Sequence, residues 1–234
     1  MAKKKSPSKK HTPDVEEKMD SAIGKTEQWL QDNTKPLLIA LIVAVLVVGG
    51  YFGYKYLIQE PRMERASDAM FVAEQLYAQE DYEAALNGDG VNEGFLDIVS
   101  SYGSTPQGRL AAHYAGICYM KAGDYDNALT YLKKYKHTKG VPAILVNAQN
   151  SGLQGDAYVQ KGDYRKASEM YDKAAQTGDN ILVTPYYLKK YAEVNEKLGN
   201  IQTAIDACKR IRDYYGNSME AREIDKMLGR LEQK

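Results

Sequence analysis

The longest apolar stretch of the chain runs from Leu37 to Tyr54, eighteen residues without a single charge. As a helix rising about 1.5 Å per residue, it would span roughly 27 Å, close to the hydrocarbon thickness of a bilayer. Lys35 and Lys55 flank the stretch and would reach the two interfaces, and aromatic residues gather at its second end. The pattern therefore predicts a transmembrane helix, which we assign to residues 37–58.

Basic residues are distributed unevenly around this segment. Eight lysines precede it, whereas Lys55, Arg62 and Arg65 follow it closely. Because positive residues favour the cytoplasmic side, residues 1–36 are expected as a basic cytosolic tail and residues 59–234 across the membrane. In a bacterium this arrangement is a signal anchor in the inner membrane with a periplasmic domain. A cleaved signal peptide is the alternative, but no small-residue cleavage site follows the apolar core.

Two smaller features accompany the predicted anchor. Residues 14–33 place apolar side chains at helical spacing, which favours an amphipathic helix on the inner leaflet. Gly49 and Gly53 form a G-x-x-x-G motif, which lets two transmembrane helices approach closely. These two glycines are the candidate contact within the membrane.

Beyond residue 58 the apolar pattern repeats itself. Residues 116–135 and 155–174 match at an offset of 39, with a small residue, a tyrosine, a Gly-Asp-Tyr turn and an alanine at equal spacing. A third copy runs from Ala192 to Ile211, and a more divergent first copy includes Ala73. The fixed spacing identifies the copies as structural repeats, with small residues such as Gly116 at equivalent positions.

The repeated residues resemble the tetratricopeptide repeat over roughly residues 66–216. Asn195 replaces the expected tyrosine in the last copy, and Asp89 replaces a large apolar residue in the first. The resemblance implies an all-α fold, a right-handed superhelical array of helix pairs preceded by one transmembrane helix. This repeat domain is assigned to residues 59–234.

Helices outside the repeats complete the predicted domain. An extra helix is expected over residues 93–103, and a C-terminal capping helix over residues 218–232 would cover the apolar end of the array. Thr105-Pro106 and Thr184-Pro185 each predict a helix start with a capping threonine and a proline in the first turn.

Catalytic or metal chemistry has no support in the sequence. His11, His113 and His137 have no cysteine or carboxylate at metal-ligand spacing, and Cys118 and Cys208 are expected to be buried free thiols. Lys+Arg and Asp+Glu both number 31, so no charge excess indicates nucleic acid. We expect no enzyme activity, no cofactor, no metal, no nucleic acid and no small-molecule substrate.

The resemblance implies binding of other proteins in a groove formed by the first helix of each pair. The groove positions carried over from the family are Met70, Glu74, Tyr77, His113, Ile117, Met120, Asp156, Val159, Lys189, Glu193 and Glu196. An apolar patch is expected around Ile117 and Met120, and a charged end around Lys189 and Glu193.

The order of basic tail, anchor and repeats resembles the ancillary subunit of the bacterial Sec translocon. This implies a membrane-anchored scaffold whose partners are translocon subunits, secreted chains or periplasmic chaperones. Two alternatives stay open from the sequence: an envelope-assembly or cell-division adaptor, and a self-assembling structural protein.

Overall fold

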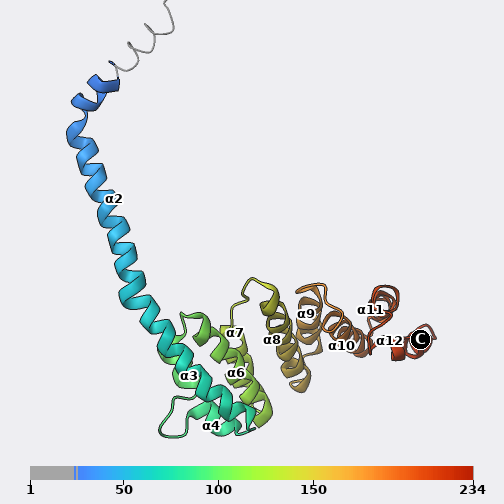
Figure 1. Cartoon of the computed structure of the whole chain (residues 1–234). Coiled ribbons are helices and arrows are strands. Elements are labelled where there is room, and N and C mark those ends of the chain that lie inside the picture. The colour runs from blue at the N-terminus through green and yellow to red at the C-terminus, as the bar shows by residue number, and fades with distance from the viewer. Residues whose placement is uncertain (1–23, 25, 234) are drawn as a thin grey trace, which may run out of the picture. The chain divides into compact units, whose positions relative to one another are not determined.

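The computed structural model describes residue 24 and residues 26–233, and the described elements are helical (Figure 1). The chain divides into two compact units, residues 1–60 and 61–234, which are described separately. The basic tail and most of the predicted amphipathic helix over 14–33 lie outside the described residues; residues 26–32 are helical.

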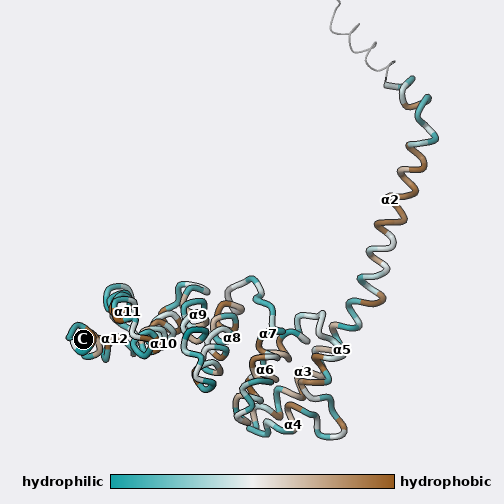
Figure 2. Tube along the Cα trace, turned by 180° about the vertical axis from the view of Figure 1, so that it is seen from behind, coloured by the Kyte–Doolittle hydropathy of each residue, from teal (hydrophilic) through white to brown (hydrophobic). Residues whose placement is uncertain are grey.

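The first unit contains the predicted span as helix α2 (Thr34–Tyr54), followed by a π-helical turn, η1 (Lys55–Gln59). No residue of α2 is buried, and the tube in Figure 2 is hydrophobic along much of this helix. Within the described residues, one continuous helical stretch is long and apolar enough to cross a membrane, with none of its most apolar window buried. A core helix of a soluble domain would instead be covered by neighbours.

The second unit is built from helix pairs that stack side by side (Figure 1). The pairs are α3 (Glu60–Ala78) with α4 (Tyr82–Asn87), α6 (Pro106–Ala122) with α7 (Tyr125–Lys134), α8 (Val141–Gln160) with α9 (Tyr164–Gln176), and α10 (Thr184–Lys197) with α11 (Ile201–Tyr214). The additional helices are α5 (Phe95–Tyr102), between the first two pairs, and α12 (Ala221–Leu231), at the end. This arrangement confirms the predicted all-α array.

The turn within each pair explains why the Gly-Asp-Tyr motif recurs. Gly123 and Gly162 have φ of 78° and 76°, a left-handed conformation that disfavours other residues. The following aspartates, Asp124 and Asp163, cap α7 and α9 by accepting bonds from backbone N–H groups three residues later. In the first pair Glu80, with φ of 64°, takes the left-handed position without a glycine.

Helix crossings confirm the repeat register. A Cβ placed on Gly116 would lie 2.5 Å from Cγ of Leu132, and one on Gly155 would lie 2.6 Å from the Tyr171 ring. Leu132 and Tyr171 are also equivalent positions of the two copies. Only a residue without a side chain lets the paired helices approach this closely.

The ends of several helices agree with the sequence in most respects. The Thr105 hydroxyl accepts a bond from the Gly108 N–H and caps α6, as predicted. The predicted helix start at Thr184-Pro185 is confirmed, because α10 begins at Thr184 with a proline in its first turn. The capping role of Thr184 is wrong, because its hydroxyl donates to the Gly178 carbonyl and accepts from the Asn180 N–H. The capping helix is present as α12, whose buried residues are Ile224, Met227, Leu228 and Leu231.

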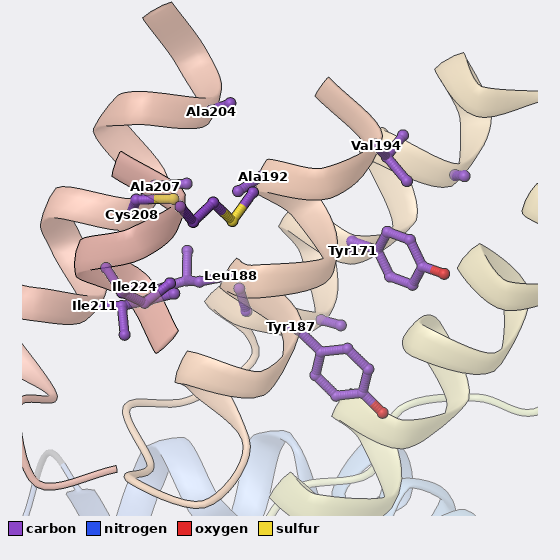
Figure 3. Packing of buried hydrophobic residues seen from close by; sticks show 14 of the residues in the cluster. Tyr171, Tyr187, Leu188, Ala192, Val194, Ala204, Ala207, Cys208, Ile211 and Ile224 are labelled. Carbon is purple, nitrogen blue, oxygen red and sulfur yellow. The ribbon is translucent and has the colours of Figure 1, made fainter. Parts of the chain in front are cut away.

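Two hydrophobic clusters form the interior of the repeat domain. One gathers side chains from α3 to α6, and the other gathers side chains from α7 to α12, part of which is drawn in Figure 3. Polar side chains bridge α6 and α8: the Asn150 amide lies 3.1 Å from Nδ1 of His113 and accepts a bond from Gln154. Both predicted free cysteines are buried, Cys118 in the first cluster and Cys208 in the second.

Candidate protein-binding groove

Two adjoining pockets lie along the first helices of the later pairs. The larger, of about 510 Å³, lies between α10 and α12 and is lined by Lys189, Glu193, Glu223, Lys226, Met227 and Arg230. The other, of about 470 Å³, is lined by Met120 of α6, three residues of α8, two of α9 and four of α10. Glu193 lines both pockets, so the two adjoin at this residue, and we call them together the C-terminal groove.

A network around Asp156 fixes the wall of the C-terminal groove. The Tyr171 hydroxyl donates a 2.6 Å bond to Asp156, and the Lys190 ammonium lies 2.6 Å from the same oxygen. Burial raises the pKa of Tyr171, and the bond to Asp156 raises it further, so the phenol stays protonated. Burial lowers the pKa of Lys190, but the bond and charge of Asp156 outweigh it, so the ammonium stays charged.

Ion pairs along the second pocket tie α10 to the capping helix. Lys189 pairs with Glu223, and Arg230 pairs with Glu196 at 2.6 Å. Such partly exposed pairs contribute little stability, but they hold long side chains in defined positions along the groove.

Charged groups that remain available come mainly from α10. Among the described residues, Glu193 and Lys197 have no ion-pair partner, and both line the first pocket beside the apolar side chains of Met120 and Val159. The groove can therefore receive an apolar side chain of a bound segment and form new ion pairs with its positively or negatively charged residues.

The structure brings together part of the predicted groove. Met120, Asp156, Val159, Lys189 and Glu193 line the two pockets, and Glu196 holds the Arg230 side chain at the second. These six residues come from α6, α8 and α10, as the repeat register predicts.

Three predicted groove positions are wrong as surface contacts. Met70, His113 and Ile117 are only 4%, 2% and 7% exposed. His113 and Ile117 are buried because α6 is covered by α5, α7 and α8 together, so its first-helix face is not open. Met70, on α3, packs inside the first hydrophobic cluster. The expected apolar patch is therefore reduced to Met120.

Glu74 and Tyr77 are half-buried and pack within the first cluster. The Tyr77 ring meets Tyr114 edge-on at 5.1 Å between centroids and Phe95 of α5 at 6.4 Å. Burial raises the pKa of Glu74, against the opposing effect of its bond to Tyr114. Both residues serve internal packing in this structure.

Several groove residues were missed by sequence reasoning. On α10 these are Lys190, Val194 and Lys197, and the spacing of Lys190, Glu193 and Lys197 by three and four residues was a usable signal for one helix face. On α12, Lys226 and Arg230 show the same spacing. They were overlooked because α12 was predicted only as a cap.

The remaining candidate chemistry is limited. A Cβ on Gly49 or Gly53 would meet nothing within 4 Å, so that side of α2 is open to a close helix neighbour. Within the described residues, no group of three His, Cys, Asp or Glu side chains is arranged to hold a metal ion.

Stacked helix pairs with an open groove along their first helices define a helical-repeat protein built to hold another protein. The family profile described as "Tetratricopeptide repeat-like domain" matches residues 27–145, just over half of the chain, and "Tetratricopeptide repeat" matches residues 153–218. The chain belongs to the tetratricopeptide-repeat family. Members of this family bind other proteins and are typically non-enzymatic, which makes the chain a protein-interaction scaffold.

Solved structures share this fold at low sequence identity. A crystal structure of MamA is 15% identical, with a TM-score of 0.51, and the match covers 73% of this chain and 89% of that one. A structure of PilF from Pseudomonas aeruginosa is 18% identical, with a TM-score of 0.49, covering 69% and 66%. At these identities the likeness to MamA shows the fold alone. A search of curated proteins gives no match.

Proposed function

We propose that the chain is a single-pass membrane scaffold that binds an extended protein segment in the C-terminal groove. The observation that carries the groove assignment is that the two pockets adjoin at Glu193 and are lined by residues of α6, α8, α10 and α12. An extended segment fits because it can follow several parallel helices, whereas either pocket alone would hold only a few side chains.

Membrane anchoring rests on the apolar helix. Its eighteen uncharged residues are uncovered, and the matched "Tetratricopeptide repeat-like domain" begins at residue 27, so the family profile includes this helix. The eight preceding lysines support a cytoplasmic N-terminus, with the repeat domain on the opposite side of an inner membrane.

For the partner, we favour the Sec machinery and the chains it exports. The resemblance in the order of tail, anchor and repeats motivates this choice. The open Gly49 and Gly53 face of α2 would contact translocon helices, while the groove holds secreted chains or periplasmic chaperones.

Site-specific photocrosslinking in cells tests both contacts. Photoreactive residues replace Met120 and Glu193 in the groove and Gly53 in the anchor, and Asp206, exposed on α11 outside the groove, serves as the control. Secreted chains or chaperones captured from the groove, together with translocon subunits captured from Gly53, would support the proposal. Capture of cell-wall or outer-membrane assembly proteins would favour the envelope-assembly alternative.

A matched pair of charge reversals tests the groove itself. Glu193→Lys should weaken capture at Met120, because it removes the unpaired carboxylate shared by both pockets. Asp206→Lys makes the same chemical change outside the groove and should leave capture unchanged. Equal effects of the two variants would refute the groove as the binding surface.

A further inference from the structure

Exposed apolar side chains gather along one edge of the repeat domain. This edge, which we call the loop edge, comprises residues 135–146, 177–183 and 214–220. These are the connections that follow α7, α9 and α11, together with the first turns of α8. Its largest exposed side chains are Leu145 (44% exposed), Ile181 (52%), Leu182 (75%), Tyr214 (79%) and Met219 (78%).

Contacts between the connections make the loop edge continuous. A Cβ on Gly178 would lie 2.7 Å from Cγ2 of Ile144, so the connection after α9 packs on the start of α8. The Tyr215 hydroxyl donates a 2.7 Å bond to Asp179, which joins that connection to the end of α11. The five exposed side chains therefore belong to one band.

The opposite edge, formed by the turns within the pairs, has a different character. Those turns carry charged and polar residues around Asp81, Asp124, Asp163 and Asn200. Within the described part of the chain, the exposed large apolar residue at these turns is Leu198, whose exposed fraction is 37%. Phe71 in α3 and Val91 after α4 are also exposed, so this contrast between the two edges holds for the part of the domain from α6 to α12.

Basic residues accompany the apolar band. The segment KKYKHTKG from Lys133 to Gly140 has four lysines and no acid, and Lys136 and Lys139 are exposed within the loop edge. Exposed apolar side chains beside a lysine cluster match the chemistry of a bilayer surface with anionic headgroups.

The start of α3 lies at the same edge. The Arg62 guanidinium donates a 2.6 Å bond to the Ser101 carbonyl in the last turn of α5, so α3 starts beside the end of α5, which leads into α6. The start of α6 in turn shares a pocket with Tyr135 and Thr138 of the loop edge.

We propose that the loop edge rests on the membrane surface, with Ile181, Leu182 and Met219 at the acyl boundary and Lys136 and Lys139 at anionic phosphates. This inference depends on the proposed anchoring by residues 37–58. A single tether leaves a domain free to rotate, whereas a second contact fixes the orientation of the groove relative to the bilayer. A lipid surface is favoured over a protein partner because exposed apolar side chains and exposed lysines occur together along these segments.

Fluorescence quenching in vesicles tests the proposal with the full chain. Leu182→Cys and Leu198→Cys place the same probe on the loop edge and on the opposite edge; the native Cys118 and Cys208 are buried. Each labelled chain is reconstituted in vesicles of phosphatidylcholine and phosphatidylglycerol that contain a nitroxide-labelled phospholipid. Quenching at Leu182 should exceed quenching at Leu198 several-fold. Changing both Lys136 and Lys139 to Gln should reduce it several-fold.

Flotation of the unlabelled chain separates this proposal from the anchoring itself. If the chain floats with vesicles but both probes are quenched equally, the anchor stands and the loop edge does not contact lipid. If the chain does not float, both ideas fail. Shielding of the Leu182 probe only after addition of a protein extract would assign the band to a protein partner and overturn the lipid contact.

Discussion

Replacing Gly116 by alanine tests the helix crossing on which the array depends. The new Cβ would lie 2.5 Å from Cγ and 2.7 Å from Cδ2 of Leu132, and 3.2 Å from the Leu132 backbone nitrogen. Leu132 is fully buried, so its side chain has no space to move into, and the backbone contact requires α6 and α7 to separate. Overpacking of this kind costs about 1–3 kcal/mol, against a gain of about 1 kcal/mol in helix propensity.

On balance, Gly116→Ala should lower the free energy of unfolding by about 1 kcal/mol and the melting temperature by about 3 °C for a domain of this size. Thermal unfolding of the full chain in detergent, followed by the near-UV circular dichroism of its tyrosines, measures the change. Gly229→Ala in α12 is the matched control: nothing lies within 4 Å of its Cβ, so propensity alone should raise the melting temperature. If the two variants shift stability in the same direction, the helix crossing is misassigned.

Three further predictions concern the interior of the repeat domain. Burial lowers the pKa of His113 from 6.5 to about 4, so the free energy of unfolding should fall by up to about 3 kcal/mol as the pH drops from 6.5 toward 4. Denaturant titrations at several pH values should show a weaker pH dependence of the unfolding free energy for His113→Gln than for the native chain. The same pH dependence in both proteins would contradict this. Burial raises the pKa of Cys118 to about 12 and of Cys208 to about 11, so thiol reagents should label both only in denaturant; rapid labelling of the native chain would refute it. Ile224→Ala should cost about 2–5 kcal/mol because Ile224 is fully buried in the cap, while exposed Lys226→Ala should be nearly neutral in the same melts.

The repeat array could be predicted from the sequence because its determinants are local and periodic. The left-handed glycines, the capping aspartates and the small crossing residues recur at fixed spacing, and each fixes its own turn or contact. Helix pairs that follow such a pattern need no long-range information to be recognised. The left-handed Glu80 escaped prediction because no glycine marks it.

The polar contacts between α6 and α8 were not predictable in the same way. His113, Asn150 and Gln154 look like ordinary solvated helix residues in the sequence, and only the packing of α8 against α6 buries them. Burial is tolerable because each side chain finds a hydrogen-bond partner across or along the helices. A pairing of this kind depends on which helices meet, which periodicity alone does not specify.

Periodicity also does not specify which first helices are covered, which explains why the observed groove lies closer to the C-terminus than the predicted one. Family register assigns groove positions as though every first helix were open, but α5 interrupts the array after the first pair. Its Phe95 ring stacks on Tyr114 at 5.1 Å and contacts Tyr77, so aromatic packing occupies a predicted groove position. The open pockets begin at Met120 and continue to α12, where a helix predicted only as a cap supplies groove residues. Changes at Tyr77 should therefore affect stability, whereas changes at Glu193 should affect partner capture at unchanged stability.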